Sequence, residues 1–347
     1  MKNKINLEKF DKNNFIGMLK SLPYQVDEIV NNRNIIINYL ESKSDFNKIL
    51  ICGMGGSAIG GDFIKSVILN NINHTAPPIY VNRDYDIPNW VDSNTFIILS
   101  SYSGNTEEVL SCYNQCKELN SFCFVMTSGG SLLDIAINEG LPYSLIPKGY
   151  MPRQALGYSV SILSKVLFKY GMIDDIIIKD LNNSIESIIK QSEEYSVIDS
   201  DNNKAINLAH KIFNKFNIIY TSQGMEVIGS RFRAQLAENA KILSSHFIFP
   251  EQNHNEIEGF QNLYFDNINI IWINDIENHR QISKRMKITK KLLTNVNHID
   301  ISFDDSNYLK RQMKLINFLD WVSYYCAIKN EVDPYPVDVI TELKDLL

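Results

Sequence analysis

The stretch KILICGMGGSAIGG, residues 48–61, decides the fold of this chain. Its first part, Lys48–Cys52, is almost wholly apolar and has the length of a short buried strand. The second part, Gly53–Gly61, contains five glycines. Glycine tolerates positive φ and lets other backbone approach closely, so a run of this kind favours a tight turn. We therefore predict a strand that enters a glycine-rich loop and then a helix.

Two later segments repeat this order. Thr95–Leu99 leads into a serine cluster, and Phe122–Met126 ends at the sequence TSGG. Helical spacing follows each loop, for example from Glu107 onward. Buried apolar strands that alternate with helices are typical of a parallel sheet with helices on both faces. The sequence thus indicates an α/β fold, and ligands of such sheets bind in the loops at the carboxyl ends of the strands.

The second half of the chain resembles the first when it is shifted by 169 residues. Within the fifteen positions Ile49–Phe63, five residues are identical in the shifted segment, all apolar or glycine. The identical pairs are Ile49/Ile218, Gly55/Gly224, Ile59/Ile228, Gly60/Gly229 and Phe63/Phe232. This repetition predicts an internally duplicated α/β unit.

The two copies differ where a ligand would bind. Ser57 corresponds to Glu226, and the hydroxyl-rich loop after Leu99 corresponds to Asn274-Asp275-Ile276-Glu277. Carboxylates repel anions, so we expect only the first copy to hold one.

A chain of 347 residues is long enough for about two domains at roughly 150 residues each. We predict an N-terminal helical segment, residues 1–45, with Leu22, Val26, Ile29 and Val30 on one face. Residues 46–170 would form the first α/β domain and residues 171–200 connecting helices. Residues 201–347 would form the second domain, which ends in a C-terminal helix.

Composition argues against several classes of protein. The chain has 34 Lys and Arg against 40 Asp and Glu, a net charge of −6, which disfavours binding to nucleic acid phosphates. Its apolar runs, such as Ile268–Ile273, are far shorter than the roughly 20 residues of a membrane-spanning helix. The five cysteines are an odd number without a C-x-x-C pair, which disfavours a disulfide framework and a zinc site. With no visible secretory signal, we expect a cytoplasmic protein.

The glycine loop is suited to an anion, because a helix N-terminus presents unpaired N–H groups and the positive end of the helix dipole. The residues Gly53 to Ala58 also satisfy the dinucleotide pattern G-x-G-x-x-A. Taken alone, this loop fits either a nicotinamide cofactor or a sugar phosphate. A nucleoside triphosphate is disfavoured, because the chain contains no G-x-x-x-x-G-K-[ST] sequence.

A second loop, Ser100–Glu108, separates these two readings. It offers three serines, a threonine and a glycine at a strand end, enough to surround a terminal phosphate monoester. The bridging pyrophosphate of a dinucleotide would not need this second set of hydroxyls. The alternative is a simple helix N-cap, since Thr106 or Asn105 before Glu107 is a good helix start in any protein. For the loop as a whole we favour phosphate binding.

The second half carries a carboxylate and a histidine that could do chemistry. Glu238 lies in the helical run Arg231–Lys241, and His254 follows sixteen residues later within Pro250–Glu256. From the residues alone, a catalytic pair and a solvated or capped pair both remain open.

In combination, these motifs resemble the bifunctional phosphoglucose/phosphomannose isomerase family, a branch of the sugar isomerase (SIS) domain proteins. The resemblance covers nearly the whole chain. It is carried in order by the glycine loop, Ser101–Glu107, Pro152–Gly157, Ala237–Lys241, Pro250–Glu256 and Ile340–Leu347. It implies two SIS-type three-layer αβα domains with parallel sheets. It also implies an aldose–ketose isomerase that interconverts glucose 6-phosphate, and mannose 6-phosphate, with fructose 6-phosphate through a cis-enediol, without metal or cofactor.

The resemblance assigns a role to each candidate residue. Glu238 would be the base that moves a proton between C1 and C2, and Arg153 would stabilise the enediolate. His254 would help to open the sugar ring from the partner subunit of a homodimer, assisted by Lys344 of the C-terminal tail. For Arg153 a structural ion pair is the alternative, and for Lys344 a favourable place at a helix C-terminus. The phosphate ligands would be Gly56, Ser57, Ser101, Ser103 and Thr106.

Two other functions remain as alternatives. A sugar-phosphate regulator would keep the phosphate loops without chemistry, and a nicotinamide-dependent dehydrogenase would use the glycine loop for its cofactor. Replacement of Glu238 by Gln separates the first from an isomerase, because only the isomerase would lose turnover.

Overall fold

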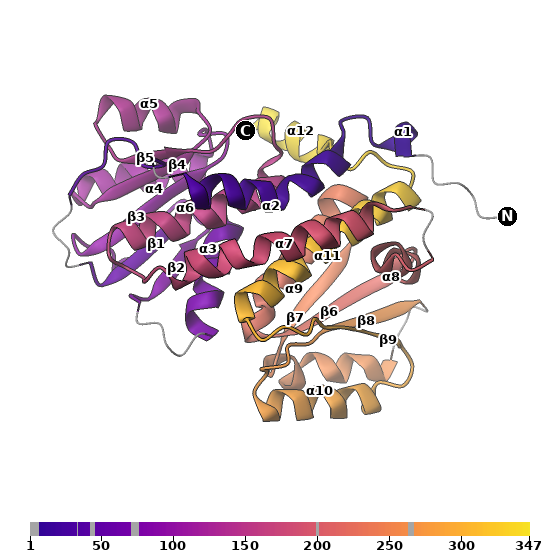
Figure 1. Ribbon diagram of the computed structural model, residues 1–347. Helices are drawn as coiled ribbons and strands as arrows, with labels where there is room; N and C mark the ends of the chain where they lie inside the picture. The colour runs from indigo at the N-terminus through magenta and orange to yellow at the C-terminus, as the bar shows by residue number, and fades with distance from the viewer. Residues whose placement is uncertain (1–6, 33, 42–45, 71–75, 199–200, 263–266) are drawn as a thin grey trace. The chain divides into compact units, whose positions relative to one another are not determined.

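The computed structural model describes residues 7–32, 34–41, 46–70, 76–198, 201–262 and 267–347 (Figure 1). The chain forms two compact units, each built around one sheet. The first-sheet unit comprises Ser21–Glu186, and the second-sheet unit comprises Met1–Lys20 and Ser187–Leu347. Their boundary crosses helices α2 (Phe15–Asn31) and α7 (Ile176–Ser196), so both units share these two helices. The predicted division of the chain into residues 1–45, 46–170, 171–200 and 201–347 stays a prediction.

The first-sheet unit contains a parallel five-stranded sheet in the order β2-β1-β3-β4-β5. The predicted strands are confirmed as β1, β3 and β4, each within one or two residues of its expected ends. The strands are β1 (Lys48–Cys52), β2 (Ile79–Asn82), β3 (Thr95–Ser101), β4 (Cys123–Thr127) and β5 (Tyr143–Leu145). The helices are α3 (Gly56–Asn70), α4 (Glu107–Glu118), α5 (Gly130–Asn138), the 3-10 helix η1 (Pro152–Gln154) and α6 (Leu156–Lys169).

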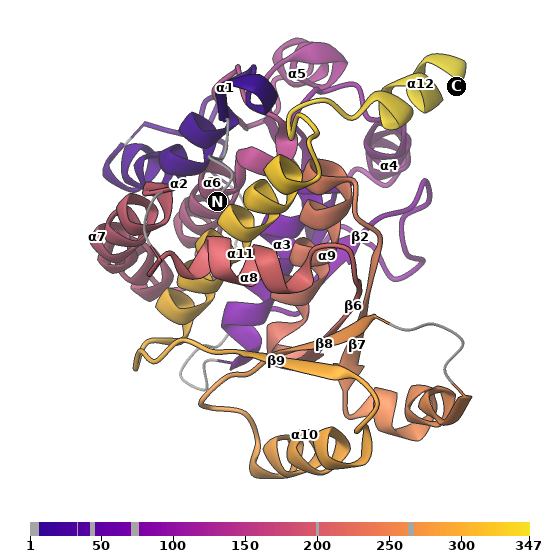
Figure 2. The same ribbon diagram turned by 90° about the vertical axis from the view of Figure 1, so that its right-hand side faces the viewer.

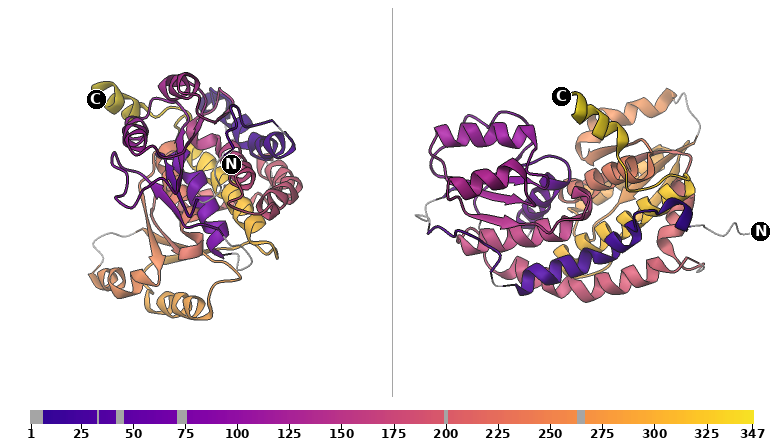
Figure 3. Two further views of the ribbon diagram at one scale, coloured as in Figure 1. Left: turned by 90° about the vertical axis from the view of Figure 1, so that its left-hand side faces the viewer. Right: turned by 90° about the horizontal axis from the view of Figure 1, so that it is seen from above.

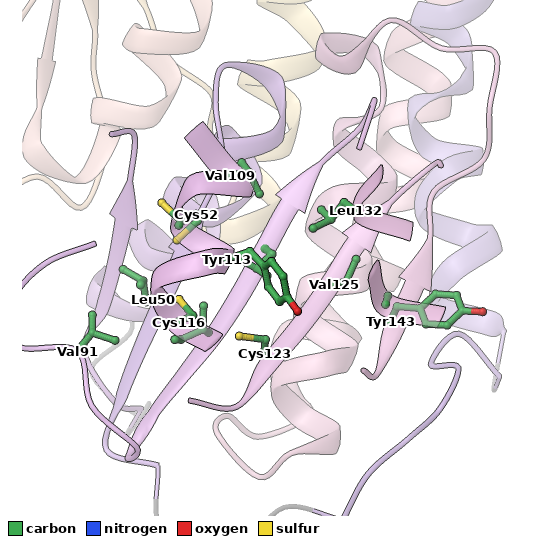
Figure 4. Close-up of a cluster of buried hydrophobic side chains, with 14 residues drawn as sticks. Leu50, Cys52, Val91, Val109, Tyr113, Cys116, Cys123, Val125, Leu132 and Tyr143 are labelled. Atoms are coloured by element: carbon green, nitrogen blue, oxygen red, sulfur yellow. The ribbon is translucent and has the colours of Figure 1, made fainter. Parts of the chain in front are cut away.

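Helices cover both faces of this sheet (Figure 3). On one face, α4 and α5 pack against alternate residues of the strands, and the resulting apolar cluster contains four of the five cysteines (Figure 4). On the other face α3 lies so close that a Cβ on Gly61 would be 3.1 Å from Ile51 Cδ1. A Cβ on Gly60 would lie 2.1 Å from Ser159 Oγ of α6. These two glycines therefore serve helix packing.

The second-sheet unit contains a parallel four-stranded sheet in the order β7-β6-β8-β9. Figure 2 shows α10 on one side of this sheet and α8, α9 and α11 on the other. The strands are β6 (Phe216–Ser222), β7 (Ser244–Phe249), β8 (Ile268–Ile273) and β9 (Asn297–Ile301). The helices are α1 (Leu7–Phe10), α8 (Lys204–Ile212), η2 (Gln223–Met225), α9 (Glu226–Ala240), η3 (Glu251–His254), η4 (Glu256–Asn262), α10 (Arg280–Leu292), α11 (Tyr308–Lys329) and α12 (Asp338–Leu346).

The duplication predicted from the sequence agrees with the topology. The order β2-β1-β3-β4 in the first sheet matches β7-β6-β8-β9 in the second. Ile49 and Ile218 lie in the equivalent strands β1 and β6, and Gly55 and Gly224 lie just before α3 and α9. The fold-class prediction of two three-layer α/β domains with parallel sheets is confirmed.

Several described residues lie in segments that the sequence analysis discussed. Helix α2 buries Leu22, Val26 and Ile29, and Val30 is half-buried. The connecting segment forms α7, although residues 199–200 of the predicted range lie outside the described residues. All five cysteines are free and buried. Over the parts of the chain that the structure describes, no helix is both long and apolar enough to cross a bilayer.

Candidate active site

The glycine loop connects β1 to α3 at the carboxyl edge of the first sheet. Gly55 adopts φ +48°, a conformation that disfavours residues with a side chain. A Cβ on Gly56 would lie 2.7 Å from the backbone nitrogen of Arg153 and from the carbonyl carbon of Pro152. Gly56 therefore allows the backbone of η1 to lie directly against the N-terminus of α3. This close approach brings Arg153, which is 4 % exposed, next to the glycine loop.

The second loop gathers its hydroxyls around Ser101. The Ser101 side chain is buried, and its Oγ lies 2.7 Å from Thr106 Oγ1 and 3.5 Å from Ser103 Oγ. The backbone N–H of Gly104 donates to the same Oγ over 3.0 Å. Thr106 occupies the position before α4, yet its side chain makes no capping hydrogen bond to that helix. The simple N-cap reading of Thr106 therefore does not describe this loop.

Ser57 joins the two loops. Its Oγ accepts a hydrogen bond from the backbone N–H of Tyr102 over 3.1 Å, and its carbonyl accepts one from Ser100 Oγ over 2.9 Å. Ser57 lies in the first turn of α3. Its backbone N–H donates to the Met54 carbonyl over 3.0 Å, and the N–H of Ala58 donates to the Gly55 carbonyl over 3.1 Å. The first-sheet unit thus collects hydroxyls from both loops beside the N-terminus of a helix, an arrangement that suits a phosphate.

The equivalent place in the second sheet is occupied by carboxylates. Strand register pairs Ile49 with Phe96 and Ile218 with Ile270, so Ser101, five residues after Phe96, corresponds to Asp275. Asp275 is buried and paired with Arg311, whose Nε lies 2.9 Å from Asp275 Oδ2. Arg311 also contacts Glu277 over 2.6 Å. The second copy fills this place with its own acidic side chains, which fits the expectation that only the first copy holds an anion.

Glu238 lies in the last turn of α9 and is half-buried. The neighbouring turns of α9 are fixed to α11 by buried polar contacts. Arg231 pairs with Asp320 over 2.6 Å, and Gln235 donates to the same carboxylate over 2.9 Å. Asn239 donates to Ser323 Oγ over 2.9 Å. These contacts fix the orientation of the helix that carries Glu238.

Lys241 ends α9 and has no role in the sequence-based assignment. It adopts the left-handed conformation at φ 57°. Its Nζ donates to the carbonyls of Glu238 over 2.7 Å, Pro336 over 2.8 Å and Asp333 over 3.2 Å. Lys241 therefore ties the end of the Glu238 helix to the segment that leads into α12. Lys241 lies in the motif Ala237–Lys241, but nothing in the sequence indicates that its backbone is left-handed.

His254 is exposed on η3, between two anchored residues. Before it, Asn253 Nδ2 donates to Thr289 Oγ1 of α10 over 2.9 Å. After it, Glu256 Oε1 accepts a hydrogen bond from Tyr220 OH over 2.7 Å. Burial raises the pKa of Glu256 to about 7, although the Tyr220 hydroxyl opposes this shift. Lys344 lies on α12, all of whose residues are exposed.

The structure therefore brings together the expected phosphate ligands within the first-sheet unit, with Arg153 beside them. These ligands are Gly56, Ser57, Ser101, Ser103 and Thr106. Glu238, His254 and Lys344 belong to the second-sheet unit. The roles of all nine residues stay predictions.

Comparison with known proteins identifies the family. The chain is 37 % identical over 338 residues to a bifunctional phosphoglucose/phosphomannose isomerase from Caldicellulosiruptor bescii, covering 94 % of this chain and 97 % of that protein. This chain belongs to the bifunctional phosphoglucose/phosphomannose isomerase family. A relative of the same name from Aquifex aeolicus is 31 % identical and covers 87 % of this chain and 91 % of its own length. The family resemblance seen in the motifs is confirmed.

Two further comparisons give a family model for part of the chain and a relative with another named activity. Residues 201–347 match the family model for the bacterial phospho-glucose isomerase C-terminal SIS domain. A D-glucosamine-6-phosphate 4-epimerase from Sulfolobus acidocaldarius is 33 % identical over 213 residues, covering 61 % of this chain and 63 % of that protein.

Solved structures with low sequence identity share the fold alone. A glucose-6-phosphate isomerase from Chlamydia trachomatis has a TM-score of 0.65 at 11 % identity, covering 94 % of this chain and 72 % of that one. The C-terminal domain of a glucosamine-fructose-6-phosphate aminotransferase from Francisella tularensis has a TM-score of 0.69 at 15 % identity, covering 92 % of this chain and 97 % of that one.

Proposed function

We propose that this protein is an aldose–ketose isomerase that interconverts glucose 6-phosphate and mannose 6-phosphate with fructose 6-phosphate. The observation that carries the proposal is the set of hydroxyls gathered around Ser101 beside the N-terminus of α3. The named activity of the full-length relatives, phosphoglucose and phosphomannose isomerisation, supports the choice of sugar. A phosphate held in these loops would fix one end of the substrate.

In the proposed mechanism Glu238 removes the proton from C2 of the aldose. The electron pair of that C–H bond forms the C1–C2 double bond of a cis-enediolate, and the carbonyl oxygen at C1 takes the negative charge. Arg153 lies beside the phosphate loops, and its guanidinium would stabilise that charge as it develops. Glu238 then returns the proton to C1, and a hydroxyl proton moves from O2 to O1. The substrate gains and loses nothing, and neither metal nor cofactor is needed.

The substrate reaches this step only after its ring opens. We assign ring opening to His254 with help from Lys344, and we propose that the protein works as a homodimer in which His254 reaches the site of the partner subunit. Exposure of His254 and of the whole of α12 is consistent with side chains that act on something outside their own unit. The five free cysteines support a reducing, cytoplasmic location.

A coupled assay tests the proposal. Fructose 6-phosphate is supplied with excess EDTA, and glucose 6-phosphate and mannose 6-phosphate are measured separately. Formation of both products supports the bifunctional isomerase, and formation of only one restricts the substrate range. If neither forms while the sugar phosphate still raises the melting temperature, a non-catalytic regulator becomes the better description. A separate incubation with D-glucosamine 6-phosphate, followed by NMR, detects a C4 epimer, the product expected if the chain shares the activity named for its epimerase relative.

A further inference from the structure

One buried carboxyl near the candidate site has no assigned role. Glu256 begins η4, two residues after His254. Its Oε1 accepts the hydrogen bond from Tyr220 OH over 2.7 Å. Glu256 is half-buried, but its Oε2 is buried and makes no hydrogen bond to any of the described residues. A buried carboxyl with one partner for two oxygens is costly, which points to a function.

Tyr220 gives this carboxyl a rigid partner. The tyrosine is fully buried in β6, and its ring packs against Trp272 of β8 and Phe249 of β7, with centroids 5.2 Å and 5.6 Å away. Its hydroxyl is therefore held in one place by the sheet. A hydrogen bond to that hydroxyl fixes Glu256, and with it the start of η4, relative to the sheet.

The residues before His254 are held equally well. Gln252 is 2 % exposed, and Asn253 donates to Gln252 Oε1 over 2.8 Å and to Thr289 of α10. His254 itself is exposed, and within the described part of the chain no hydrogen bond to its imidazole is seen. The turn is thus anchored on both sides, while the imidazole stays free to meet a ligand.

We propose that Glu256, held by Tyr220, is a positioning residue that fixes the turn carrying His254 in the geometry needed for ring opening. This inference rests on the proposed function, since it assumes that His254 acts on the sugar. Glu256 does not touch the substrate in this scheme. It acts through the backbone of residues 254–256, because a carboxyl that leaves Tyr220 releases the downstream end of the turn.

The protonation state of Glu256 changes the strength of this anchor. Burial places its pKa at about 7, so the neutral carboxyl predominates below that pH. Above it, a buried carboxylate must rely on the single Tyr220 hydrogen bond. Tyr220 of β6 is the titratable group that faces the carboxyl, and Gln252 of η3 is neutral. Because burial raises this pKa from 4.5 to about 7, the anchor should be firmest below about pH 4.5 and should weaken as the pH rises to about 7.

The test compares Tyr220→Phe and Glu256→Gln with a matched control, Glu258→Gln, which changes an exposed carboxyl on the same 3-10 helix. Imidazole resonances of ¹³C-histidine-labelled protein are recorded without substrate from pH 5 to 9, with His254 assigned from His254→Ala. The kcat and KM values for isomerisation are measured over the same pH range. The spectra test the positioning of His254 even if the wild type has no isomerase activity. In that case the proposed function is wrong, and the spectra still decide whether Glu256 and Tyr220 position His254.

We expect Tyr220→Phe to shift or broaden the His254 resonance and to lower kcat by roughly 10- to 100-fold, with KM little changed. Glu256→Gln keeps an acceptor for Tyr220 but cannot ionise, so it should retain activity. The pH profile of its His254 resonance should differ from that of wild type by the change that ionisation of Glu256 adds. Glu258→Gln should behave as wild type. The proposal is overturned if Tyr220→Phe leaves the His254 resonance unchanged. It is also overturned if the pH profile of the His254 resonance is identical in Glu256→Gln and wild type, or if Glu258→Gln reproduces the effects of the other two variants.

Discussion

The hydroxyl oxygens of Ser101 and Thr106 lie 2.7 Å apart, although Thr106 stands at the position from which it could cap α4. Its side chain is turned across the loop and away from the helix backbone. A threonine that only started a helix would bond to an N–H of the first turn. The contact with Ser101 instead brings hydroxyl groups of the loop together, and the predicted effect of removing these hydroxyls depends on it.

Removing these hydroxyls should weaken substrate binding more than turnover. A hydrogen bond to a charged group contributes about 1.5–3 kcal/mol, so Ser101→Ala and Thr106→Val should each raise KM by roughly 10- to 100-fold. The measurement is steady-state kinetics with fructose 6-phosphate, together with thermal shifts in inorganic phosphate. Ser111→Ala, on α4 but outside the loop, is the control and should leave KM unchanged. If both loop variants keep the wild-type KM, these hydroxyls do not bind the substrate phosphate.

Gly56→Ala should damage the site through the backbone. The new Cβ would meet Arg153 N and Pro152 C at 2.7 Å, and backbone atoms cannot rotate away as a side chain can. We expect η1 to move with Arg153, and kcat/KM to fall by about 100-fold, because an ångström-scale displacement of a catalytic group has an effect of that size. Gly259→Ala is the control, since nothing lies within 4 Å of its added Cβ. Equal kinetics for the two variants would contradict the close packing of η1 on α3.

Stability should fall in mild acid because of His246. Its ring lies between Thr221 Oγ1, 2.8 Å away, and Ser230 Oγ, 3.2 Å away, and burial lowers its pKa to about 4. The folded state therefore binds fewer protons than the unfolded state between pH 6.5 and 4. The contribution of His246 to the free energy of unfolding is present in full above about pH 6.5. It falls by about 3 kcal/mol as the pH drops to 4.

Urea unfolding at pH 7.5, 6, 5 and 4 measures this loss, and His246→Gln isolates it from other groups. In His246→Gln the free energy of unfolding should fall less between pH 7.5 and 4, by the amount that His246 contributes. If the free energy of unfolding changes equally with pH in the variant and in wild type, His246 is not held neutral in the fold.

The proposed homodimer makes a prediction about mixed subunits. Glu238→Gln and His254→Ala should each be inactive, but a mixture refolded together should regain activity, because one of the two sites then has an intact Glu238 from one subunit and an intact His254 from the other. The measurement is the isomerase assay on mixtures of varied ratio, with the molar mass determined by light scattering. A monomer, or mixtures with no recovered activity, would place the whole site within one chain.

Much of the fold was predictable because its signals are local. The strand Lys48–Cys52, the glycines after it and the helix from Glu107 each follow from a few adjacent residues, and all three are found as expected. The register-based match of Ser101 with Asp275 likewise follows a duplication visible in the sequence.

The contacts that shape the site were not predictable, because they join residues far apart in the chain. The approach of Arg153 to Gly56, the bond between Tyr220 and Glu256, and the contact from Lys241 to Pro336 each depend on tertiary packing. The direction of the Thr106 side chain was also hidden, since the same residues favour a cap when read locally.

The most direct test of the account is isomerisation of fructose 6-phosphate in D₂O, followed by NMR of the glucose 6-phosphate formed by wild type and by Glu238→Gln. If Glu238 carries the proton between C1 and C2, wild type should place deuterium at C2 in the fraction of turnovers in which the carboxyl exchanges with solvent. Glu238→Gln should form product at least about 100-fold more slowly while still binding the sugar phosphate. Wild-type turnover and wild-type deuterium incorporation in Glu238→Gln would contradict the central claim that Glu238 is the base of this isomerase.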